Sequence, residues 1–141
     1  MDDGLVLTGE FFRQEAQMIS ESNFDVPVAK WNAAKGEARE IMIARARKRG
    51  MISYSDLVSK IEGLYLEPHD PRLFHLLGQI SAEEDAAGRG MLTVVVVHKV
   101  GDMQPGPGFF ELAEHLGRDT SDLLKCWVEE LHKVHAIWEN N

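Results

Sequence analysis

The chain has 141 residues, of which 44% are hydrophobic and 27% charged, proportions typical of one folded domain with a real core. The formal net charge of -8 argues against indiscriminate binding to nucleic acid or anionic membranes, and the single cysteine, Cys126, excludes an internal disulfide. No run reaches the roughly 18 apolar residues of a membrane span, and the start Met-Asp-Asp-Gly lacks the pattern of a secretory signal. We therefore expect a cytoplasmic protein with no membrane partner.

Two helices are predicted in the first 50 residues. Residues 1–8 read as a tail or a short strand, and a helix follows over 9–20. A second helix is expected from Pro27 to about Arg49, because proline is tolerated in a first helical turn, and Gly50 is expected to stop it. Its buried stripe recurs at spacings of three and four residues: Trp31, Ala34, Ala38, Ile41 and Met42.

Capping residues indicate where the next two helices begin. Ser53 is followed three residues later by Asp56, which is typical of a capping box. Asp70 is the expected cap of a third helix with Pro71 at its first position. The buried face expected for this third helix consists of Leu73, Phe74, Leu77 and Ile80.

The middle of the chain contains the clearest strand pattern. A separate short helix is expected to begin at Ser81, because Glu84 follows it at capping-box spacing, and to end at the glycines of 88–90. Residues 91–98 include four consecutive valines, which favour a strand buried on both faces. The loop 101–108, with two prolines and three glycines, can continue neither a helix nor a strand.

Two helices are predicted after this loop. The first spans 109–116 and ends at Gly117. The last begins at a cap on Asp119 or Thr120 and keeps the helical period for four turns. Its apolar side consists of Leu123, Leu124, Trp127, Leu131, Val134 and Trp138.

The order of these elements from about residue 36 to residue 108 is similar to that of a winged helix-turn-helix domain. The segments that carry the resemblance are 52–57 at the start of the second helix, 73–80 as the third helix, 92–97 as the strand and 101–108 as the wing. The segments 88–90 and 107–110 look like the signature of a small bacterial family.

We expect one mainly helical α+β domain over residues 1–141. It would have a winged-helix-like centre at 29–108 with one strong strand, an N-terminal helical addition at 1–28 and C-terminal helices at 109–141.

A basic segment interrupts the acidic chain. Residues 30–50 hold seven lysines and arginines and two glutamates, a net charge of +5. This segment and the winged-helix resemblance suggest a small, non-catalytic nucleic-acid-binding or regulatory protein with double-stranded DNA as partner. The expected phosphate contacts come from Arg45, Arg47, Lys48 and Arg49. Base contacts would come from one face of the third helix, and Lys99 would lie in the wing. The residues of that face are Arg72, His75 and Gln79.

The alternative is a protein-interaction or oligomerisation module that binds no nucleic acid. A homodimer would form through the terminal helices, 9–20 and 120–139, where Trp127 and Trp138 share a face.

No catalytic motif is found, and no cofactor is expected. Glu129, His132 and His135 could line one side of the last helix as metal ligands. Because that helix has an apolar opposite side, we expect them to face water, and we expect Cys126 to be a buried structural thiol.

Overall fold

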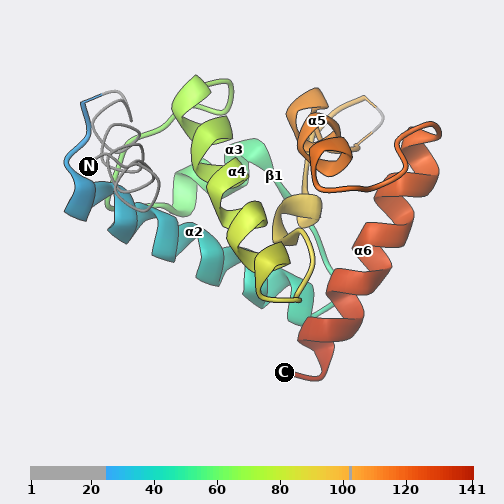
Figure 1. Cartoon of the computed structure of the whole chain (residues 1–141). Coiled ribbons are helices and arrows are strands. Elements are labelled where there is room, and N and C mark those ends of the chain that lie inside the picture. Colours follow the sequence, from blue (N-terminus) through green and yellow to red (C-terminus); the bar gives the residue numbers. More distant parts are fainter. Residues whose placement is uncertain (1–24, 102) are drawn as a thin grey trace, which may run out of the picture. The chain divides into compact units, whose positions relative to one another are not determined.

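The computed structural model describes residues 25–101 and 103–141, so the predicted tail at 1–8 and helix at 9–20 lie outside the described residues. The described part is mainly helical with a small two-stranded parallel sheet (Figure 1). Its elements are α2 (Val28–Arg47), β1 (Ile52–Ser53), α3 (Tyr54–Lys60), α4 (Pro71–Ala86), the 3-10 helix η1 (Leu92–Val95), β2 (Val96–Val97), α5 (Pro107–His115) and α6 (Leu123–Glu139). By internal contacts the chain divides into two compact units, 1–33 and 34–141, and every element from β1 onward belongs to the second. None of the helices in the described residues is long and apolar enough to cross a membrane.

The caps predicted for α3 and α4 are confirmed. The Ser53 hydroxyl accepts a hydrogen bond from the Asp56 backbone N–H at 3.0 Å. The Asp70 carboxylate accepts one from the Arg72 backbone N–H at 2.9 Å, and Pro71 is the first residue of α4. These local signals are reliable because each satisfies an N–H group that the helix itself leaves unpaired.

Three predicted helix boundaries are wrong. α5 begins at Pro107, inside the segment predicted as a loop, and not at residue 109. α2 ends at Arg47, and the residue with left-handed backbone geometry is Arg49 (φ 55°), whereas Gly50 donates its N–H to the Arg45 carbonyl. α6 begins at Leu123 with Asp122 as its cap; Asp119 instead accepts a hydrogen bond from the Ser121 backbone within the preceding turn.

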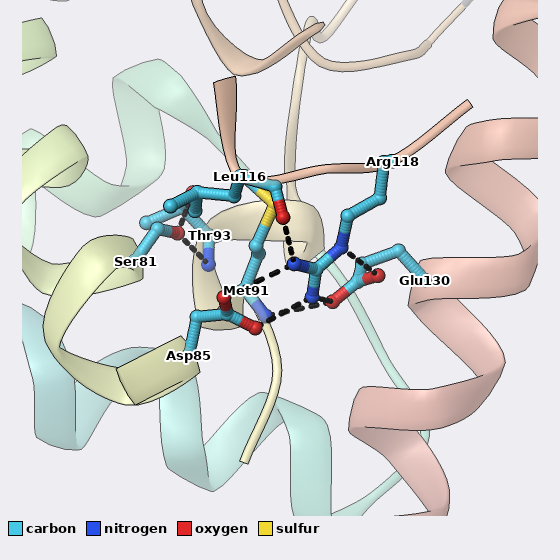
Figure 2. A network of polar contacts seen from close by, with 7 residues as sticks. All are labelled: Ser81, Asp85, Met91, Thr93, Leu116, Arg118 and Glu130. Carbon is cyan, nitrogen blue, oxygen red and sulfur yellow. Dashed lines mark hydrogen bonds and ion pairs between the residues drawn. The ribbon is translucent and has the colours of Figure 1, made fainter. Parts of the chain in front are cut away.

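The separate helix predicted from Ser81 does not exist, because α4 continues without a break to Ala86. Ser81 is fully buried, and its hydroxyl lies 2.5 Å from the Thr93 hydroxyl and accepts the Thr93 backbone N–H at 3.1 Å (Figure 2). A serine hydroxyl can cap a helix or bond to a distant segment, and here the Ser81 hydroxyl bonds to Thr93.

The predicted long strand at 91–98 is also wrong. Only Val96 and Val97 form a strand, which pairs with Ile52 and Ser53 of β1 in parallel. The preceding residues form η1, which contacts both α4 and α6 and is buried throughout. Side chains satisfy its backbone, since the Trp127 indole donates to the Val94 carbonyl at 3.2 Å. Without a partner strand alongside, β-propensity alone does not extend the chain.

One half-buried arginine joins three elements (Figure 2). Arg118 lies between α5 and α6 and donates to both carboxylate oxygens of Asp85 on α4 at 2.6 and 3.0 Å. It also donates to both carboxylate oxygens of Glu130 on α6, at 2.9 and 3.0 Å. These hydrogen bonds raise the pKa of Arg118, Asp85 contributing first, and Arg118 lowers the pKa of Asp85.

Glu130 extends this network to the start of η1. One of its oxygens accepts the Met91 backbone N–H at 2.8 Å. The chain can pass this close because Gly90 has a φ of +82°, and a Cβ there would lie 3.1 Å from the same carboxylate. The Glu130 side chain is 6% exposed, so the carboxylate depends on these partners in place of water.

We predict that Glu130→Ala lowers the free energy of unfolding by about 3 kcal/mol, because it leaves the half-buried Arg118 with one of its two carboxylate partners and the buried Met91 N–H without an acceptor. The exposed neighbour provides the matched control, and Glu129→Ala should change stability by less than about 0.5 kcal/mol. Urea unfolding followed by circular dichroism measures both. Equal effects of the two substitutions would contradict the role given to Glu130.

Candidate functional site

A cavity of about 620 Å³ is bounded by α4, α5, η1 and the segments that flank β1 and β2. Its wall is mostly apolar. The apolar and glycine residues are Phe74, Leu77, Gly78, Ala82, Gly106, Pro107, Gly108, Phe109 and Leu112, and the polar ones are Tyr54, His75, Gln79, Thr93, His98 and Glu111. A few polar groups in a concave apolar wall are typical of a small-molecule site.

An aromatic cluster of Tyr54, Phe74 and His98 forms one side of this cavity. The Tyr54 and Phe74 rings pack edge to face at 5.9 Å, and the Tyr54 and His98 rings lie 5.1 Å apart. The Tyr54 hydroxyl accepts the Gly106 backbone N–H at 2.8 Å, and burial raises the pKa of Tyr54. The hydroxyl therefore stays protonated at neutral pH. Because its oxygen accepts from Gly106, its hydrogen is left to donate elsewhere.

The other polar side chains of the α4 wall belong to a series of hydrogen bonds that joins α2 to α4. Lys35 of α2 donates to the Gln79 side-chain oxygen at 3.4 Å and to Glu83 at 2.7 Å. With the oxygen of Gln79 so engaged, its amide nitrogen faces Nε2 of His75 at 3.3 Å. Nε2 then acts as an acceptor. Partial burial, followed by the charge of Lys35, lowers the pKa of His75, so the ring is neutral at pH 7.

The eight residues predicted to contact nucleic acid lie in separate places. Only His75 and Gln79 line the cavity. Arg72 shares their helix, but its guanidinium is held by Asp70, 2.7 Å away, and it lowers the pKa of that carboxyl. Lys99 is exposed beyond β2.

The basic cluster at the end of α2 bonds mainly to neighbouring chain segments. Arg45 donates to the Met51 carbonyl at 2.7 Å. Arg47 donates to the Asn141 carbonyl at 3.2 Å, and Arg49 pairs with Glu139 at 2.7 Å. Lys48 is exposed beside them.

This basic cluster and Arg72 do not share a site. Arg39 of α2 pairs with Glu83 of α4 at 2.5 Å, which fixes where the two helices meet. Measured from that point along the helix axes, Arg72 lies about 16 Å toward the start of α4, whereas Arg47 lies about 12 Å toward the end of α2.

One of the residues considered as metal ligands, His135, has another role. His135 is buried, contrary to expectation, and its Nε2 lies 3.0 Å from the Gly50 carbonyl. The described part of the chain contains no group of three or more histidine, cysteine or carboxylate residues placed to hold a metal. Cys126 is buried as predicted, and burial raises the pKa of its thiol.

Sequence reasoning missed most of the cavity wall. Phe74, which the sequence predicts on the buried face of its helix, is 43% exposed and lines the cavity. His98 ends the valine run, and Tyr54 follows the α3 cap, so neither has a local pattern that predicts a site. The one signal was the segment 107–110, which is distinctive and contributes three residues to the wall.

Comparisons with models of protein families, with curated proteins and with solved structures found no match.

We predict that Tyr54→Phe lowers the free energy of unfolding by about 1–3 kcal/mol, because the buried Gly106 N–H loses its acceptor. Tyr65→Phe is the matched control, since Tyr65 is 75% exposed and its hydroxyl only donates to Glu67. Chemical unfolding and hydrogen exchange at Gly106 measure the effect. Unchanged protection of that amide in Tyr54→Phe would show that the hydrogen bond is not formed in solution.

Proposed function

We propose that this protein binds a small, planar and largely apolar ligand in the cavity between α4 and α5. The observation that carries the proposal is the cavity itself, about 620 Å³ with aromatic rings in its wall. Small-molecule sites occupy roughly 300–1,000 Å³ and combine an apolar wall with a few polar groups that fix orientation. The cluster of Tyr54, Phe74 and His98 offers ring edges and faces against which a planar ligand can stack.

The small residues on α4 support this proposal. Gly78 lies within the helix and lines the cavity, and a Cβ built on it would meet no atom within 4 Å. Glycine inside a helix costs about 0.5–1 kcal/mol relative to alanine. Gly78 therefore leaves volume open in the cavity at a cost in helix stability.

Filling this volume tests the proposal. The neutral fluorophore N-phenyl-1-naphthylamine, which brightens in apolar surroundings, should bind the parent protein. We predict that Gly78→Leu weakens this binding by at least about 10-fold, because the new side chain occupies the cavity. The same change should raise the thermal midpoint, because leucine is the better helix former.

Gly36→Leu is the matched control for this substitution. Gly36 lies within α2, does not line the cavity, and also has open space where a Cβ would be. Gly36→Leu should raise the thermal midpoint in the same way and leave the affinity for the fluorophore unchanged. Absence of binding to the parent protein, or equal loss in both variants, would contradict the proposal.

Binding to duplex DNA through phosphate contacts is a second candidate. It is supported by the exposure of Arg47, Lys48 and Arg49 at the end of α2. In the ion pair of Arg49 with Glu139 both side chains are 47% exposed, and such pairs contribute only about 0–1 kcal/mol. These side chains can therefore exchange their present partners for phosphates at little cost.

Fluorescence anisotropy of labelled mixed-sequence duplex DNA, at about 50 and 200 mM salt, tests the second candidate. Replacing Arg47, Lys48 and Arg49 together by alanine should weaken binding and reduce the slope of log affinity against log salt by up to about 3. The control replaces three other exposed lysines, Lys60, Lys125 and Lys133, which changes the net charge equally. No binding at low salt would contradict this candidate. The protein's mass in solution, recorded alongside, tests the homodimer alternative.

A further inference from the structure

The charge of the cavity wall restricts which ligands fit it. Among the residues that line it, Glu111 is the only carboxylate, and none is a lysine or an arginine. His75 is neutral there, because burial and Lys35 lower its pKa. Lys35 is the basic residue bonded to this wall, and its charge is compensated by Glu83 at 2.7 Å. The wall is therefore negative on balance.

Glu111 lies on α5 and lines the cavity, where its carboxylate can contact a bound ligand. Pro107, Gly108, Glu111 and Leu112 all line the cavity, and this spacing puts them on one face of the helix. The start of α5 contributes a partial positive charge of about one half at most, which falls off within the first turn. The full negative charge of Glu111, just beyond that turn, outweighs it.

Aromatic rings complement this charge. Phe74, Tyr54 and Phe109 line the same cavity, and the faces of phenyl and phenol rings attract cations within about 6 Å. The net charge of -8 acts in the same direction, since it raises the local concentration of cations over anions.

We propose that the ligand is a cationic aromatic compound: a planar ring system bearing a protonated amine. The ring would lie against Tyr54, Phe74 and Phe109, with the ammonium group directed to the Glu111 carboxylate. This inference rests on the proposed function of the cavity and adds the chemical class of its occupant.

Three naphthalene compounds of nearly equal size test the inference: 2-naphthylmethylamine, 2-naphthylmethanol and 2-naphthoic acid. At pH 7 they are a cation, a neutral molecule and an anion. Calorimetric titration of the full chain should rank them in that order, with the amine about 3- to 10-fold tighter than the alcohol. This preference should shrink as salt is raised, because Glu111 is solvent-exposed.

Glu111→Gln should remove the preference for the amine over the alcohol. Glu114→Gln is the matched control, since Glu114 is an exposed carboxylate on the same helix that does not line the cavity, and it should keep the preference. If the alcohol binds as tightly as the amine, or the acid binds best, the cationic class is wrong while the cavity remains a binding site. If none of the three binds, the proposed function itself fails.

Discussion

The ion pair of Arg118 with Asp85 and Glu130 is the interaction on which the described structure depends most. It connects α4 to α6 through an arginine in the segment that follows α5, and Glu130 continues it to the backbone at the start of η1 (Figure 2). A buried charge without partners is costly, so the groups stabilise the fold only as a complete set. This requirement fixes the position of three elements at once.

The valine run shows the consequence of that constraint. Glu130 holds the backbone at Met91, and Ser81 holds it at Thr93. Between these anchors the chain turns as a 3-10 helix and reaches a sheet only at Val96, beside Ile52. The shift from strand to turn leads the chain to His98, whose ring meets Tyr54 at one side of the cavity.

α4 contributes to two different environments. Ser81 and Asp85 take part in the buried polar contacts with η1 and Arg118, whereas Phe74, Gly78 and Ala82 line the cavity. Residues four apart lie on one face of a helix, so the two sets form separate stripes. The polar contacts of one stripe with η1 and Arg118 therefore also fix the position of the stripe that lines the cavity.

The sequence by itself determined the mainly helical class, the caps at Ser53 and Asp70, the buried stripe of α2 apart from the half-buried Ile41, and the burial of Cys126, because each follows from contacts within a few residues or from simple periodicity. Only the tertiary structure decided which partners Ser81 and Arg118 bond to and which conformation the valine run adopts, since the partners lie 12 to 33 residues away. The cavity, too, was decided only by the tertiary structure. It unites Tyr54, Gly78 and Glu111 from three helices, and no local pattern encodes a space that exists only after those helices pack.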